Sequence, residues 1–295
     1  MMFSLSSLAP STLSSRWRTL DDRGLWVLLA GLVGSYLFLL SLLTQMPDEA
    51  INVALVFGGA MVVFQGFPEG WQPRPGRVGR WVGAGLLVLV LARGQRIMAF
   101  DFASSLLPPL AGLGLILLAG PWSQRQMFLR PLLVLGFLPV MRWLSWVTPL
   151  GPLSTVTAWI THQFLWFLGT PSRLSGIFIY LPTSGVKVSD ACAGLNMLLQ
   201  LFVVAVIFAM AFPMRHRWQN ALMLATAPLI ALLTNAGRIM ALAMINDSSL
   251  VNRKWWFDFF HEQWGGLVFS GIAMEVFVSL YVYWMARQVA ALGSR

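Results

Sequence analysis

Long apolar runs recur along the whole chain, and they constrain its fold more than any other feature. Runs of about 17 or more apolar residues match the thickness of a bilayer, because a helix rises about 1.5 Å per residue. Hydrophobic residues make up 57% of the 295 residues and charged residues 11%, well below the charged fraction of a soluble domain. We therefore predict an all-α polytopic membrane protein.

About eight of these runs are expected to be transmembrane helices. The segment between the fifth and sixth runs lacks a spanning stretch. Within it, Leu153 to Leu168 is amphipathic and predicts an external helix lying in the membrane interface. Two short β-type stretches flank Pro182–Gly185 and predict a small β-hairpin before the sixth span. The predicted spans are about Leu25–Leu43, Ala50–Phe67, a stretch from Trp81 that Arg93 and Arg96 interrupt, Ala103–Gly120, Pro131–Val147, Leu195–Phe212, Ala221–Ile245 and Gly265–Met285.

We divide the chain into three parts. These are an N-terminal arm at residues 1–24, a five-helix membrane scaffold at 25–149 and a catalytic membrane core at 150–295. Eight spans place both termini on one side, and the short loops on that side carry most of the arginine residues. The positive-inside rule therefore predicts cytoplasmic termini. No convincing small-residue cleavage site follows the first span, which predicts an uncleaved signal-anchor.

The net charge of +9 does not indicate a nucleic-acid partner. The basic residues are scattered over short loops between apolar runs, which is typical of orientation signals and of contact with anionic membrane lipid. A nucleic-acid-binding protein would present a clustered basic face.

The single cysteine, Cys192, cannot form an internal disulfide. Ser189 and Asp190 are favourable N-cap residues, and if the sixth helix begins there, Cys192 lies in its first turn. A helix N-terminus favours a thiolate and offers amides to an oxyanion, although the charge of Asp190 opposes this. The alternative is a small buried apolar side chain with no role in chemistry.

Arg238 has apolar residues on both sides and is expected near the outer headgroup boundary. An arginine within a span is costly and usually faces a polar interior, and Asn235 lies three residues earlier on the same helical face. The alternative is an arginine whose side chain extends to lipid phosphates.

His261 lies in an aromatic segment typical of a membrane interface and can transfer protons near neutral pH. His162 stays open as an alternative base, and His216 is expected to be solvated. Cys192, Arg238 and His261 together supply a nucleophile, an anion stabiliser and a proton carrier for acyl transfer. We expect no metal, because the histidines and the cysteine lack familiar ligand spacings, and no cofactor.

Glu275 lies near the middle of the eighth span. We expect a buried carboxyl that is hydrogen-bonded or protonated and supports helix packing.

These residues resemble the exosortase/archaeosortase family of membrane transpeptidases. The resemblance covers about Thr157 to Met285, whereas the first five spans match only as generic apolar helices. In this sequence Ala193 follows the cysteine, where the family commonly has serine. The matching elements are Val188-x-x-Ala-Cys-Ala-Gly-Leu195, Asn235-x-x-Arg238 and His261-x-x-x-Gly265, preceded by Thr157-Ala158, Gly169-x-Pro171, Gly176-x-x-Ile179 and Leu181-Pro182.

The resemblance implies an enzyme of the bacterial cytoplasmic (inner) membrane whose site faces the periplasm. Its partners would be secreted proteins with a C-terminal sorting tail, of which PEP-CTERM is the usual bacterial version. Cys192 would form a thioester at the tail motif, His261 would move protons, and Arg238 would stabilise the oxyanion or orient the substrate. The supporting or substrate-binding residues would be Asn235, Gly194, Asp190 and Ala193.

Two other classes of function stay open at this stage. A multi-span transporter or lipid-handling protein would use Arg238 and Glu275 to line a path, but its usual internal repeat is not visible. A non-catalytic membrane scaffold would tolerate substitution at all three polar positions.

Overall fold

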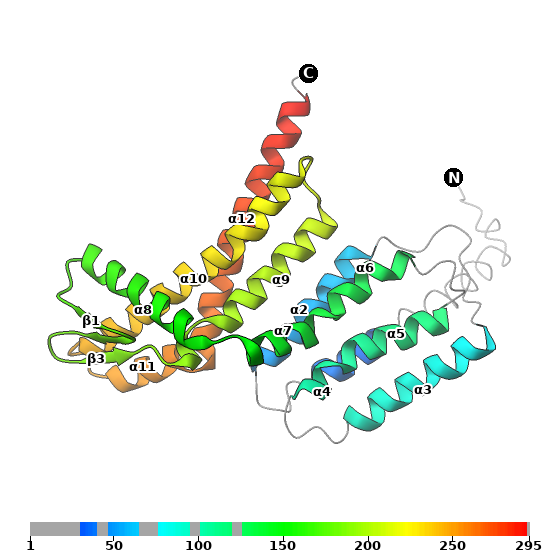
Figure 1. Ribbon diagram of the computed structural model, residues 1–295, viewed down its shortest axis with the longest axis horizontal. Coiled ribbons are helices and arrows are strands. Elements are labelled where there is room, and N and C mark those ends of the chain that lie inside the picture. Colours follow the sequence, from blue (N-terminus) through cyan, green and yellow to red (C-terminus); the bar gives the residue numbers. More distant parts are fainter. Residues whose placement is uncertain (1–29, 40–46, 65–75, 95–100, 120–125, 294–295) are drawn as a thin grey trace, which may run out of the picture. The chain divides into compact units, whose positions relative to one another are not determined.

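The computed structural model describes most of the chain, which is largely helical with one small sheet (Figure 1). It divides into two compact units, Met1–Pro139 and Val140–Arg295. The predicted arm at residues 1–24 and both ends of the first predicted span lie outside the described residues. The described residues are 30–39, 47–64, 76–94, 101–119 and 126–293.

Four helices of the described chain are long and apolar enough to cross a membrane. Three shorter apolar helices accompany them, and each of the three overlaps a predicted span. The structure therefore confirms a mostly helical protein with membrane-spanning helices, while a total of eight spans stays a prediction. The four long segments are Phe102–Ala119, Met127–Val147, Arg217–Asp247 and Trp264–Ala290, and the shorter ones are Ala30–Leu39, Ala50–Val63 and Leu195–Ala211.

In the N-terminal unit, α3 packs against α5 and α2 packs against α6. Helix α5 also contacts α6. The last helix to begin in this unit, α7 (Phe137–Val147), runs across its boundary. The unit also contains α2 (Pro47–Val63), α3 (Arg77–Gly94), α4 (Phe102–Ser105), α5 (Leu107–Ala119) and α6 (Gln126–Leu135).

The predicted fourth span is interrupted, as its proline pair indicates. Two helices, α4 and α5, replace one, and the break falls at Leu106. Pro108 and Pro109 then lie in the first turn of α5, where a missing N–H removes no helical hydrogen bond. The fifth predicted span is likewise divided into α6 and α7 on either side of Gly136.

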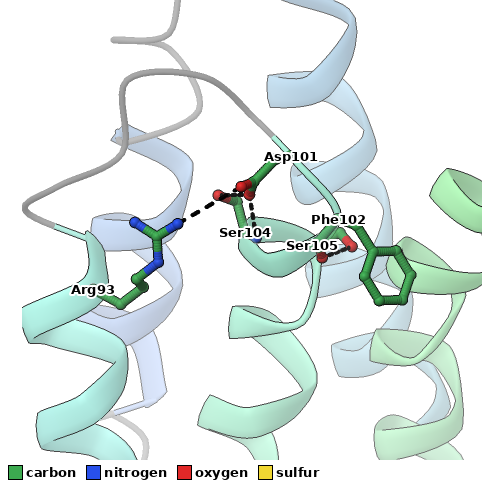
Figure 2. A network of polar contacts seen from close by, with 5 residues as sticks. All are labelled: Arg93, Asp101, Phe102, Ser104 and Ser105. Carbon is green, nitrogen blue, oxygen red and sulfur yellow. Dashed lines mark hydrogen bonds and ion pairs between the residues drawn. The ribbon is translucent and has the colours of Figure 1, made fainter.

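Asp101 fixes the start of α4 (Figure 2). Its Oδ1 atom accepts hydrogen bonds from the Ser104 amide at 2.8 Å and the Ser104 hydroxyl at 2.6 Å. Its Oδ2 atom lies 3.6 Å from Arg93 at the end of α3. The carboxylate therefore caps one helix and links it to the preceding one.

The C-terminal unit contains the predicted sixth, seventh and eighth spans as α9 (Leu195–Ala211), α10 (Arg217–Asp247) and α12 (Gln263–Gly293). Helices α10 and α12 lie antiparallel, because Gln219 near the start of α10 bonds Gln288 near the end of α12. The sheet, α8 and α11 gather at the C-terminal end of α10 (Figure 1).

Helix α8 (Leu150–Phe167) occupies the region predicted to hold an interfacial helix. It packs against α10, and the hydroxyl of Thr161 donates to the Ala236 carbonyl of α10 at 3.2 Å. One face of α8 is buried, so this helix belongs to the packed core of the unit. Its position relative to a membrane interface stays a prediction. The buried residues are Ser154, Thr157, Ala158, Thr161 and Leu165.

The predicted β-hairpin is confirmed as strands β2 (Phe178–Tyr180) and β3 (Gly185–Lys187), which pair antiparallel. A third strand, β1 (Arg173–Ser175), pairs with β2 and was not predicted. The hairpin turn is tied to the end of α10, because Asp247 accepts from the Thr183 amide at 2.9 Å and its hydroxyl at 2.7 Å. The hairpin that precedes the Cys192 segment is therefore held against the end of α10.

Candidate active site

Cys192 ends a short 3-10 turn, Asp190–Cys192, and does not lie in the first turn of a helix. Its amide donates to the Ser189 carbonyl at 2.8 Å, but the Ser189 side chain makes no capping bond. Helix α9 begins only at Leu195, after Gly194 adopts a left-handed conformation with φ of 91°. The interpretation of Ser189 and Asp190 as helix caps was therefore wrong, whereas the predicted span from about Leu195 begins where α9 begins. Gly194 separates the turn from the helix because glycine enters this conformation without steric cost.

Two side chains hold the backbone just after the 3-10 turn. Asn235 of α10 donates from Nδ2 to the Cys192 carbonyl at 2.9 Å. Thr157 of α8 donates from its hydroxyl to the Ala193 carbonyl at 3.1 Å. The predicted supporting residues Asn235, Gly194 and Ala193 thus lie together around the nucleophile candidate.

His261 is the last residue of α11 (Arg253–His261). Its ring stacks on Phe257 one turn earlier, with centroids 5.5 Å apart and an angle of 12° between the planes. The chain then turns sharply into α12, and a Cβ atom on Gly265 would lie 2.4 Å from the Phe260 backbone. Glycine at this position therefore permits the turn that presents His261.

The structure brings the cysteine and the predicted base into contact. The Cys192 Sγ atom lies 3.7 Å from Nε2 of His261, a distance suited to a hydrogen bond with sulfur. Cys192 is 5% exposed, whereas His261 is exposed. The thiol is thus enclosed by protein on most sides while its proton partner is open to solvent or substrate.

Arg238 lies on the same face of α10 as Asn235, one turn further along, and is 8% exposed. One guanidinium nitrogen approaches the start of α12, since a Cβ atom on Gly266 would lie 3.3 Å from it. Arg238 is therefore directed at the segment that immediately follows His261. A buried guanidinium at this point supplies positive charge where a low dielectric strengthens its effect.

An apolar cluster surrounds the thiol. Cys192 belongs to a buried cluster that also contains Val188 before it, Ile179 of the sheet, and Ile239 and Leu242 of α10. Phe257 and Phe260 of α11 border the same cluster. These residues shield the Cys192 side of the pair from water, while His261 stays exposed.

The remaining candidates from the sequence make other contacts. His162 forms a hydrogen bond of 3.0 Å with Ser172, which links the end of α8 to the start of β1. Asp190 is exposed and accepts from the Ser154 hydroxyl at 3.4 Å. Within the described chain, no group of three or more histidine, cysteine, aspartate or glutamate residues could hold a metal ion.

Glu275 accepts a hydrogen bond from Ser279 at 3.0 Å, as expected of a hydrogen-bonded carboxyl. It is nevertheless exposed on α12, so the prediction of burial was wrong. It points away from the packed side of α12, where Ala273 and Phe277 are buried.

Sequence reasoning missed the contribution of α8 to this site. Ser154, Thr157 and Thr161 recur at intervals of three and four residues, and all three are buried. This spacing places hydroxyl groups on one helical face, and it is the signal that could have identified them. In the sequence, Thr157 is distinguished only as part of the Thr157-Ala158 element of the family resemblance.

The family model described as transmembrane exosortase matches residues 45–278 of the chain. The match covers most of both compact units and includes Cys192, Arg238 and His261. No curated protein and no solved structure gives a match.

Proposed function

Because the chain belongs to the transmembrane exosortase family, we propose that it is a membrane cysteine transpeptidase that cleaves C-terminal sorting signals of secreted proteins. The observation that carries this proposal is the contact of 3.7 Å between Cys192 Sγ and His261 Nε2. A thiol beside an imidazole is the arrangement that converts a weak nucleophile into a reactive one.

In the first half of the reaction, His261 accepts the thiol proton and Cys192 Sγ attacks the carbonyl carbon of the scissile peptide bond. The tetrahedral intermediate collapses when the carbon–nitrogen bond breaks, and the protonated His261 returns the proton to the leaving amine. The product is a thioester on Cys192. In the second half, His261 removes a proton from an incoming amine or water, whose attack releases the thiol.

Arg238 has the role of stabilising the oxyanion or of orienting the substrate. Its burial and its approach to Gly266 place positive charge beside the segment that carries the base. A fixed positive group stabilises charge that develops in the transition state without the cost of reorganising water. The amides at the start of α9, from Leu195 onward, contribute in the same sense because the first turn of a helix leaves its N–H groups unpaired.

The position of the site suits a substrate anchored in the membrane. Arg238 lies in the last third of α10 and His261 directly precedes α12, and both helices are long enough to span. A sorting tail with its own apolar span of about 20 residues would bring its motif to the level at which these helices leave the bilayer. We assign this level to the outer face of a bacterial inner membrane, with both termini in the cytoplasm.

The test is to co-express each variant with a tail-bearing secreted protein and to measure shortening of that protein. Cys192→Ala and His261→Ala are expected to leave the tail in place, and Cys192→Ser is expected to retain at most a trace of activity. The matched control is His162→Ala, which removes a histidine bonded to Ser172 instead of the cysteine. Full processing by Cys192→Ala would exclude the proposal, and loss with His162→Ala but not with His261→Ala would reassign the base.

A further inference from the structure

The backbone turn after Cys192 depends on donors that come from outside its own segment. Gly194 interrupts the helical hydrogen-bond pattern, and the first bond of α9 runs from the Leu198 amide to the Gly194 carbonyl at 3.0 Å. The carbonyls of Cys192 and Ala193 precede that bond. A buried carbonyl requires a donor, and these two receive theirs from Asn235 and Thr157.

Both donors are enclosed in the protein. Asn235 is 1% exposed and Thr157 is 0% exposed, so water does not substitute for either bond. They come from α10 and α8, which pack against each other and are further joined by the bond from Thr161 to the Ala236 carbonyl. The turn is therefore held at two consecutive peptide groups by a pair of helices that are fixed to one another.

We propose that Asn235 and Thr157 are positioning residues that hold the Cys192–Gly194 turn so that Sγ stays in contact with His261. The inference rests on the proposed function, in which this contact activates the thiol. Residues of α8 and α10 then hold the nucleophile in place, while the base belongs to a different helix, α11. Misplacement of a reacting group by about 1 Å can reduce the rate by about 10²-fold, so the two donors act on turnover without touching the substrate.

Asn235 also links the nucleophile to Arg238. The two residues are three positions apart on α10, so one rigid helix positions the Cys192 carbonyl and presents the guanidinium. Loss of either bond acts on Sγ through the turn. Loss of the Asn235 side chain also removes the group that lies against Gly194. Asn235 variants are therefore expected to be the more damaging of the two.

The experiment compares isosteric substitutions on α8 in the full chain, purified in detergent and supplied with a tail peptide. Thr157→Val removes the bond to the Ala193 carbonyl with little change of shape, and Thr157→Ser retains the hydroxyl. Thr161→Val is the matched control, because the Thr161 hydroxyl is equally buried and faces the carbonyls of Thr157 at 2.8 Å and Ala236 at 3.2 Å, neither of which belongs to the turn. Melting temperature, kcat and KM are measured for each.

Thr157→Val is expected to lower kcat by about tenfold with KM nearly unchanged. Thr157→Ser is expected to restore kcat, and Thr161→Val is expected to keep it even where its melting temperature falls as far. An equal loss of kcat in Thr161→Val and Thr157→Val, or none in either, would overturn the proposal. Asn235→Ala is expected to lower kcat further, and Asn235→Asp provides an isosteric substitute if the alanine variant does not fold.

A second readout separates this inference from the proposed function. Cys192 is the only cysteine of the chain, so iodoacetamide alkylation followed by mass spectrometry reports on it alone. His261→Gln is expected to slow alkylation in the wild-type background and to have a smaller effect in the Thr157→Val or Asn235→Ala background. Equal effects in all backgrounds would refute the positioning role, whatever the outcome with the peptide. Cleavage by Cys192→Ala would refute the transpeptidase. The alkylation rates would still test whether Thr157 and Asn235 hold Cys192 in contact with His261.

Discussion

Replacement of Gly194 by alanine tests the turn at its tightest point. The φ of 91° lies in the left-handed region, where a residue with a Cβ atom costs about 1–2 kcal/mol. The new Cβ atom would also lie 2.5 Å from Nδ2 and 2.6 Å from Cγ of Asn235. Asn235 must then move away from the Cys192 carbonyl, and loss of that hydrogen bond costs about 0.5–1.5 kcal/mol. The sum is a destabilisation of about 1.5–3.5 kcal/mol.

Gly176→Ala provides the matched control for backbone strain alone. Gly176 has a φ of 60°, and no heavy atom lies within 4 Å of a Cβ atom built on it. Its replacement is expected to cost about 1–2 kcal/mol, and processing activity is expected to stay close to that of the wild type. The difference between the two alanine variants therefore isolates the displacement of Asn235.

A double-mutant cycle with Asn235→Ala identifies the atom that is displaced. In the Asn235→Ala background the clash is absent, so Gly194→Ala is expected to cost only the strain seen with Gly176→Ala. Thermal unfolding in one detergent at one scan rate gives the comparison, and processing of a tail-bearing protein gives the activity. Equal melting temperatures for Gly194→Ala and Gly176→Ala, or additive effects in the cycle, would refute the reasoning.

Three further substitutions are expected to have distinct effects. His261→Gln is expected to lower single-turnover cleavage by about 10²–10⁴-fold, because proton transfer at the Cys192 contact is lost. Arg238→Lys keeps a charge but loses the planar guanidinium, and steady-state kinetics are expected to show a lower kcat with a smaller change in KM. The pKa of Asp101 is held below its usual range, first by the Ser104 hydroxyl and then by the Ser104 amide. Its stabilising effect is therefore present above a pH of about 4 and is lost as pH falls through the lower folded-state pKa. Wild-type melting temperatures are expected to fall in that acidic range towards those of Asp101→Asn, whose own values change less.

Apolar length predicted the long helices of the C-terminal unit well. The expected spans Ala221–Ile245 and Gly265–Met285 lie inside α10 and α12, and both helices extend a few residues further at each end. A membrane span is predicted from the composition of a single segment, without knowledge of the rest of the fold. The hairpin could also be predicted from one segment, because its turn residues are adjacent in the sequence.

The place of Cys192 relative to α9 could not be predicted from local capping preferences, although the apolar run indicated a helix start at about Leu195, where α9 begins. Ser189 and Asp190 favour a helix start, whereas Gly194, in a left-handed conformation with φ of 91°, separates the 3-10 turn from α9. Asn235 of α10 lies against Gly194, since a Cβ atom there would lie 2.5 Å from its Nδ2 atom. A capping preference of two residues does not include this contact between distant segments, and the cysteine lies in a turn before the helix instead of in its first turn.

The role of Thr157 could not be predicted from its own segment, because the carbonyl that it bonds belongs to Ala193 of a distant segment. Asn235 and Thr157 both donate to backbone carbonyls of an irregular segment. An irregular segment next to apolar helices leaves carbonyls that lipid cannot satisfy, so the helices around it must supply donors. Buried polar residues on α8 and α10 are thus explained by the turn at Cys192. The need to satisfy that turn also places Asn235, and with it Arg238, on the face of α10 that meets the thiol.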